Sequence, residues 1–266
     1  PKTYAETGVG DQGRPFYSRG LIHSMAELEK VVLPDPHDDA LYAEAEAFAR
    51  QKGDRAAFLI TRVGIFSTML SIGFEDFSVA LYEDRAFVEA LLDRYIDWTV
   101  VVAERVSELG FDVYASTDDM AFKSAPFFSP AVFRELVLPR YQRVAQALRL
   151  PWVVHSDGHM TPFLDDLASL GIAGMHPNER GAMDIRAVKR DYGDRLCVLG
   201  NVDLDLLARG MPHEVDAEAR SLLRDLGPGG GYILTSGNSL TSYLKPENVL
   251  AMATACRRYG TYPISC

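Results

Sequence analysis

Cysteine, long apolar stretches and excess basic charge are scarce in this sequence. Its three cysteines have no Cys-x-x-Cys spacing, so an odd and sparse count predicts no disulfide framework and fits a reducing cytoplasm. No run of about 18 apolar residues occurs, and the N-terminus has neither a basic nor an apolar leader region. We therefore expect a cytoplasmic protein that is neither secreted nor membrane-spanning.

Basic residues are outnumbered, because 27 Lys and Arg stand against 37 Asp and Glu and give a formal net charge of -10. Such a charge repels phosphate backbones and argues against nucleic acid as the main partner. Neither G-x-G-x-x-G nor G-x-x-x-x-G-K-[ST] occurs, so the usual phosphate loops are missing too. A small-molecule substrate or another protein is the expected partner.

The chain of 266 residues is 47% hydrophobic, which is enough apolar material for one sizeable core. No linker-like segment divides it, so we predict one domain over residues 1–266. From about residue 57, short apolar runs alternate with helical patterns, as in a parallel sheet built from βα units. The six predicted strands are Ala57–Val63, Asp112–Ser116, Trp152–His155, Ala173–His176, Leu196–Gly200 and Tyr232–Thr235.

Helical patterns fill the intervals, with proline at several starts and glycine where several should stop. The predicted helices are Met25–Val32, Asp38–Gln51, Glu83–Leu109, Pro130–Leu148, Pro162–Leu170, Ile185–Tyr192, Pro212–Leu226 and Pro246–Tyr259. This order predicts an α/β fold, a (β/α)8 TIM barrel, in preference to an open doubly wound sheet. Because no buried strand is evident before residue 57, we expect the missing N-terminal strands of the barrel to lie upstream.

Polar residues just beyond each apolar run are the candidate site, since chemistry in βα barrels sits at the C-terminal ends of strands. They are Arg62; Thr117, Asp118 and Asp119; His155, Asp157 and His159; His176 and Glu179; Asn201 and Asp203; and Ser236, Asn238 and Ser239. A purely structural barrel would not need so many, which disfavours a non-catalytic binding protein.

His155 and Asp157 are the sharpest pair, because residues two apart on an extended chain point to one side. They suit a zinc ion, with Asp119 or His176 as third ligand, or a general acid–base or substrate-binding site, or a structural polar network. Of Asp118 and Asp119, one is expected in the pocket, while the other is either a second catalytic group or a helix cap.

Asn201 and Asp203 are candidate substrate-binding residues, or equally a turn followed by a helix cap. Arg62 would clamp a substrate carboxylate or pair with an acidic neighbour. His176, Glu179, Ser236 and Asn238 complete the expected substrate-binding set.

Several motifs together resemble the uroporphyrinogen decarboxylase superfamily over roughly residues 20–260. The motifs are Phe111-Asp112…Asp118-Asp119, Ser129-Pro130…Phe133-Arg134-Glu135…Pro139, His155-Ser156-Asp157-Gly158, Gly200-Asn201-Val202-Asp203 and Gly230-Gly231-Tyr232…Pro246-Glu247. The resemblance implies a barrel, a homodimer as a family expectation, and one of two chemistries: decarboxylation of a porphyrinogen or other polycarboxylate, which needs no cofactor, or methyl transfer involving a corrinoid or a thiol.

Departures from the family pattern help to choose. The decarboxylases resembled here end their last strand in Gly-His, where this chain has Gly237-Asn238, and the thiol methyltransferases hold zinc with His-x-Cys, where it has His155-x-Asp157. The resemblance therefore favours a methyltransferase with zinc on His155, Asp157 and Asp119, and with the corrinoid carried by a partner protein. A decarboxylase using Arg62 and the acidic strand ends is the alternative.

Overall fold

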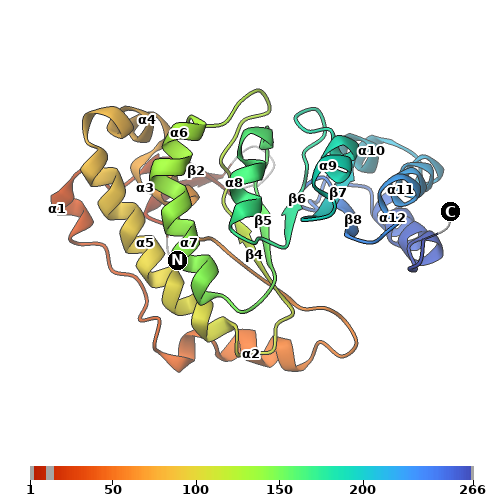
Figure 1. The fold of residues 1–266 in the computed structure, drawn as a ribbon, viewed down its shortest axis with the longest axis horizontal. Coiled ribbons are helices and arrows are strands. Elements are labelled where there is room, and N and C mark those ends of the chain that lie inside the picture. Colours follow the sequence, from red (N-terminus) through yellow and green to blue (C-terminus); the bar gives the residue numbers. More distant parts are fainter. Residues whose placement is uncertain (1–2, 10–14, 265–266) are drawn as a thin grey trace. The chain divides into compact units, whose positions relative to one another are not determined.

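The computed structural model describes residues 3–9 and 15–264, which alternate between strands and helices (Figure 1). Two compact units interleave along the chain. The first unit comprises Pro1–Met120, Phe128–Val153 and Ser169–Gly171, and the second comprises Ala121–Phe127, Val154–Ala168 and Ile172–Cys266. The single domain inferred from composition stays a prediction.

Six strands form one sheet in chain order, and all six were predicted from the sequence to within about three residues. They are β3 (Phe58–Thr61), β4 (Val113–Thr117), β5 (Trp152–His155), β6 (Gly174–His176), β7 (Cys197–Val202) and β8 (Tyr232–Ser236). Parallel pairing places Phe58 opposite Val113 and Val198 opposite Tyr232. Such short, apolar runs are typical of strands covered on both faces.

Helices follow every strand of this sheet, which gives the βα repeat of a TIM-barrel-like fold and confirms the predicted fold class. They are α3 (Ile65–Ile72), α4 (Phe74–Glu83) and α5 (Arg85–Val106) after β3; α6 (Pro130–Val132), a π-helical turn (Phe133–Val137) and α7 (Leu138–Ala147) after β4; α8 (Leu164–Ser169), which a 3₁₀ turn (Thr161–Phe163) precedes, after β5; α9 (Ile185–Tyr192) after β6; α10 (Leu204–Arg209) and α11 (Pro212–Leu226) after β7; and α12 (Pro246–Tyr259) after β8.

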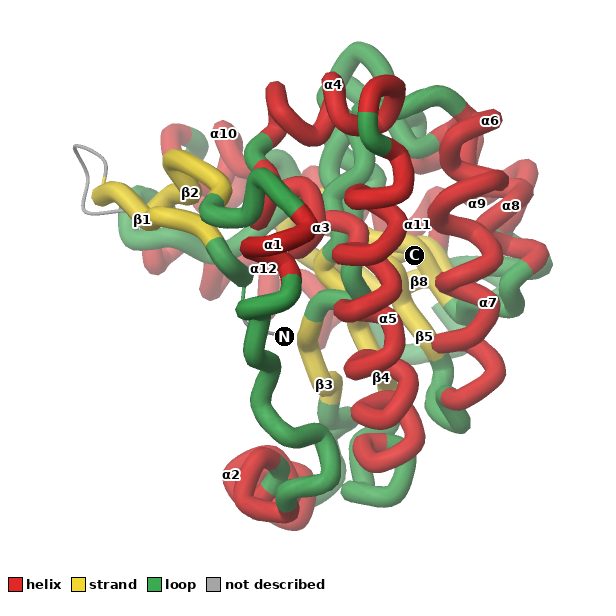
Figure 2. Tube along the Cα trace, turned by 90° about the vertical axis from the view of Figure 1, so that its left-hand side faces the viewer, coloured by secondary structure: helices red, strands yellow, loops and turns green. Residues whose placement is uncertain are grey.

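In the first unit, α5 and α7 run side by side (Figures 1 and 2). Helix α5 begins at Arg85 because the Asp84 carboxylate accepts a hydrogen bond from Phe87 N at 3.2 Å. One face of α5 buries apolar side chains at helical spacing, and Arg140 of α7 makes a forked ion pair with Asp93 of α5, with both N–O distances 2.8 Å.

The second unit contains β7 and β8 and the packed pair α11 and α12. Gly200 in β7 has φ 140°, and a Cβ there would lie 2.1 Å from Pro177 O. The Tyr232 hydroxyl of β8 donates to Gly200 O at 2.5 Å. Only glycine fits where these backbones approach so closely.

The N-terminal region holds no strand of the six-stranded sheet among residues 3–9 and 15–57, as predicted. It forms instead an antiparallel hairpin, β1 (Ala5–Val9) and β2 (Pro15–Gly20), which the sequence did not reveal (Figure 2). The predicted helix over Met25–Val32 shortens to α1 (Met25–Leu28), and the one over Asp38–Gln51 splits into a 3₁₀ turn (Asp39–Leu41) and α2 (Ala43–Arg50). None of the helices in the described ranges has both the length and the apolarity needed to cross a bilayer.

Candidate functional site

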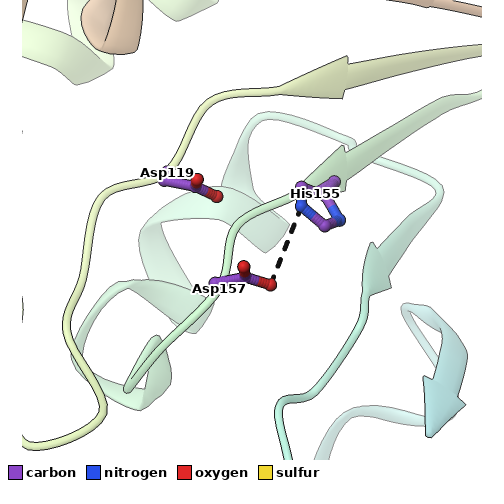
Figure 3. A group of neighbouring side chains, drawn as sticks. All are labelled: Asp119, His155 and Asp157. Atoms are coloured by element: carbon purple, nitrogen blue, oxygen red, sulfur yellow. Dashed lines mark ion pairs between the residues drawn. The ribbon is translucent and has the colours of Figure 1, made fainter. Parts of the chain in front are cut away.

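His155 is the last residue of β5 and Asp157 lies two residues beyond the strand, and their side chains point toward one another as predicted (Figure 3). His155 Nε2 lies 3.7 Å from Asp157 Oδ1, and both side chains are partly exposed, at 19% and 31%. His155 ends the strand and Asp157 belongs to the segment that follows it, so the two side chains meet just beyond the C-terminal end of β5. The pair is therefore accessible to a ligand while remaining anchored to the sheet.

His176, at the end of β6, sets the tautomer of His155. The two Nδ1 atoms are 2.6 Å apart and the rings stack with centroids 4.8 Å apart. The pKa of His176 is lowered to about 3, mainly because the ring is buried and also because His155 lies beside it. A hydrogen bond with the Ser236 backbone raises this pKa by a smaller amount. The other ring nitrogen of the neutral His176 is hydrogen-bonded to the Ser236 backbone, so Nδ1 of His176 is a hydrogen-bond acceptor. We therefore assign the proton between the two rings to His155 Nδ1. The lone pair of His155 Nε2 then faces Asp157.

Asn238 holds the second oxygen of Asp157. Its Nδ2 donates to Asp157 Oδ2 at 2.6 Å, and its own Oδ1 accepts from Ser239 N at 2.6 Å, which fixes the orientation of the amide. Ser236 Oγ donates to Asn238 O at 2.7 Å. The loop after β8 thus contacts Asp157 through Asn238. Substrate binding by Ser236 and Asn238 stays a prediction.

Asp119 completes a group with His155 and Asp157, in which one ligand atom from each residue lies within 4.8 Å of the others (Figure 3). Ligands on tetrahedral zinc at 2.0–2.2 Å stand about 3.4 Å apart. The 3.7 Å between His155 Nε2 and Asp157 Oδ1 is close to that spacing. Imidazole nitrogen and carboxylate oxygen are both zinc ligands, and a catalytic zinc site uses three protein ligands, so the donor types and their number fit the ion, although with one histidine fewer than the common set of two histidines and one glutamate.

Asp118, in the first unit, binds backbone amides near the start of α3. The buried carboxylate accepts hydrogen bonds from Val63 N at 2.6 Å, Gly64 N at 3.1 Å and Phe66 N at 3.3 Å. Burial raises its pKa and these amides lower it. Because these amides lie at and just before the start of α3, Asp118 has a structural role as the cap of that turn. A functional role for Asp119 stays a prediction.

Arg62, also in the first unit, binds the N-terminal hairpin. Its Nη1 donates to Thr3 Oγ1 at 2.9 Å and to the Tyr17 hydroxyl at 3.1 Å, and its guanidinium lies 5.2 Å and 5.1 Å from the ring centres of Tyr17 and Phe66. The partners of Arg62 are thus hydroxyl groups and aromatic rings, whereas one of the two alternatives from the sequence was an acidic neighbour. A substrate carboxylate on Arg62 stays a prediction.

Asn201 and Asp203 follow the structural alternative in the second unit. Asn201 is buried and donates to Asn178 O at 2.7 Å, while Asp203 caps α10 by accepting from Asp205 N at 2.7 Å and pairs with Arg180 at 3.3 Å. Asn201 therefore lies within β7, where its side chain joins the strand to Asn178, and Asp203 is the helix cap that the sequence offered as an alternative.

Glu179 links two loops of the same unit. Its Oε2 accepts from Gly158 N at 2.8 Å and its Oε1 lies 3.2 Å from Lys123 Nζ. Sequence reasoning missed Lys123, because no motif surrounds it. His159 turns toward Ala182 O, 3.0 Å from its Nδ1.

Comparisons with known proteins agree with this architecture. The sequence profile of one family, described as uroporphyrinogen decarboxylase (URO-D), matches residues 6–259. A uroporphyrinogen decarboxylase of Pelodictyon phaeoclathratiforme is 26% identical over 245 residues, which is 86% of this chain and 68% of that protein. The methylcobamide:CoM methyltransferase MtaA of Methanosarcina barkeri is 28% identical over 172 residues, 64% of this chain and 49% of that protein.

A solved structure has the same fold. A methyltransferase from Methanosarcina mazei superimposes with a TM-score of 0.78 at 23% identity, covering 97% of this chain and 76% of the other. The enzymes similar to this chain thus include both decarboxylases and methyltransferases.

Proposed function

The chain belongs to the uroporphyrinogen decarboxylase family, and from that premise we propose that it is a methyltransferase whose centre is a zinc ion on His155, Asp157 and Asp119. It would move a methyl group between a small substrate and a corrinoid held by a separate protein. The observation that carries the proposal is the His155–Asp157 pair, with ligand atoms on one side of β5.

Neighbouring residues prepare this pair for a cation. His176 Nδ1 accepts a hydrogen bond from the protonated Nδ1 of His155, which leaves His155 Nε2 with a free lone pair for a metal, and Asn238 holds Asp157 in place. A histidine ligand whose other ring nitrogen is hydrogen-bonded, beside a carboxylate that is itself hydrogen-bonded, is the usual surrounding of a zinc site. Imidazole and carboxylate donors are harder than thiolates and suit oxygen or nitrogen groups of a substrate.

When bound, zinc would supply a Lewis acid that polarises the atom carrying the methyl group. The protein residues orient that group: Asp157 and Asp119 provide negative charge, and the β5 backbone fixes the direction of His155 Nε2. The resemblance to a methylcobamide:CoM methyltransferase supports a corrinoid as the methyl carrier.

Metal binding and methyl transfer test the proposal. Protein purified without chelators should contain one zinc per chain, and His155→Ala and Asp157→Ala should lose it. His213→Ala, which removes an exposed histidine of α11, is the matched control and should retain the metal. Wild-type protein should change the visible spectrum of methylcobalamin in the presence of a methyl acceptor.

Two results would contradict the proposal. Unchanged zinc content in His155→Ala would remove the ligand assignment. Carbon dioxide release from uroporphyrinogen without any methyl transfer would assign the chain to the decarboxylases, its other relatives.

A further inference from the structure

An exposed aromatic pair lies on the segment 121–127 of the second unit. The rings of Phe122 and Phe127 meet edge to face, with centroids 4.4 Å apart and planes at 82°. Phe122 is nevertheless 61% exposed. Aromatic pairs in this arrangement are usually parts of cores or binding surfaces, because they present a large apolar area with few rotatable bonds.

Backbone contacts fix this segment against the residues that follow Asp157. His159 N donates to Phe122 O at 2.8 Å. A Cβ on Gly158 would lie 2.4 Å from Ala121 O and 2.5 Å from Phe122 O, so the two backbones are as close as glycine permits. The backbone of Phe122, which carries the exposed ring, is thus held against Gly158 and His159, the residues that follow Asp157.

A second anchor joins the same two segments. Lys123 pairs with Glu179 at 3.2 Å, and Glu179 accepts from Gly158 N at 2.8 Å. The ion pair with Glu179 neutralises the positive charge of Lys123, and its neighbour Phe122 is a large apolar side chain exposed on the same turn. The turn closes on itself through Phe122 N, which donates to Ala125 O at 2.8 Å.

The loop after β8 brings further apolar surface to the same aspartate. Asn238 of this loop is bonded to Asp157 at 2.6 Å, and two residues later Leu240 is 55% exposed. Both segments that attach to Asp157 or its neighbour Gly158 therefore carry exposed, large apolar side chains. Ligand sites commonly combine such apolar walls with a few polar groups at one end.

We infer that Phe122, Phe127 and Leu240 bind an apolar ring in the part of the substrate that does not react, with the reacting group directed to His155 and Asp157. The inference rests on the proposed function only in taking that pair as the reacting end. A planar ring of about six atoms matches the aromatic pair, since stacking contacts between rings favour offset or edge-to-face geometry. The ligand class is therefore a small molecule with an aromatic ring next to its polar reacting group.

Methoxybenzene and methanol are suitable probes, because both present a methyl–oxygen group and only one has a ring. Binding is measured by ligand-observed saturation-transfer NMR titration of metal-free protein. Wild type should bind methoxybenzene at least tenfold more tightly than methanol, and Phe122→Ala should weaken methoxybenzene binding roughly tenfold. Phe122→Leu, which keeps an apolar side chain, should show an intermediate loss, and Leu250→Ala, which truncates an exposed leucine of α12, should show none.

The outcomes separate this inference from the proposed function. His155→Ala should keep the ring affinity while losing zinc. Unchanged methoxybenzene affinity in both Phe122→Ala and Phe122→Leu would overturn the ring site, whatever the metal content. If the Phe122 variants lost activity with a corrinoid carrier protein but kept the wild-type affinity for methoxybenzene, the aromatic pair would be a docking surface for that partner. This result would also overturn the ring site.

Discussion

Replacing Asn238 by alanine tests whether hydrogen bonding around Asp157 supports metal binding. The change removes a 2.6 Å hydrogen bond to Asp157 Oδ2 from a residue that would not itself touch the ion. A hydrogen bond to a charged group contributes about 1.5–3 kcal/mol, and the partial exposure of Asp157 places this bond at the lower end. We therefore expect zinc affinity to fall roughly tenfold to thirtyfold, within the range for the loss of such outer contacts.

Competition of zinc between the metal-free protein and a chromophoric chelator measures the effect. Ser239→Ala is the matched control, because only the backbone of Ser239 bonds to Asn238. That variant should bind zinc like wild type. If Asn238→Ala binds zinc within twofold of wild type while remaining folded, the carboxylate does not depend on Asn238, and the reasoning that links the β8 loop to the metal is refuted.

Three further changes test the scaffold. Asp118→Ala leaves three amides at the start of α3 without their acceptor, and urea unfolding should show a loss of about 3 kcal/mol; a loss under 1 kcal/mol would contradict the capping role. Gly200→Ala should prevent accumulation of folded protein, because its Cβ would meet Pro177 O, whereas Gly229→Ala, with φ 83° and open space, should cost only about 1–2 kcal/mol of unfolding free energy. A double-mutant cycle on Arg140 and Asp93 should give a coupling of about 1 kcal/mol, and coupling near zero would mean that this forked pair does not stabilise the packing of α5 on α7.

The sheet was predictable because strands covered on both faces are short apolar runs bounded by turn residues. The helix α3 was not, although it is adjacent to a predicted strand. Seven of its eight residues are buried, so it lacks the polar face that gives a helix its periodicity. The hairpin of β1 and β2 was not predicted for the opposite reason. Its residues are largely exposed, so apolar and polar residues do not alternate along it as they do in a half-buried strand.

At the site, local spacing predicted His155 and Asp157 but not the roles of their neighbours. Spacing of two on a strand fixes the side on which residues lie, whereas His176 and Asn238 are 21 and 81 residues away in sequence from their partners His155 and Asp157. The sequence placed both at strand ends without showing that one sets a tautomer and the other holds a carboxylate. Likewise, two adjacent aspartates gave no means of telling that Asp118 caps α3, because that depends on the direction each takes after β4.

The charges of the groups around His155 and Asp157 agree with the proposal that a cation binds there. The low pKa of His176 means that this ring adds no positive charge, and Asn238 supplies a neutral amide. The proposed ligands are one imidazole and the carboxylates of Asp157 and Asp119, and a divalent ion would offset the repulsion between the two carboxylates. In the proposed site, the partners of His155 and Asp157 from β6 and from the loop after β8 would orient the two ligands and add no positive charge that would compete with the ion.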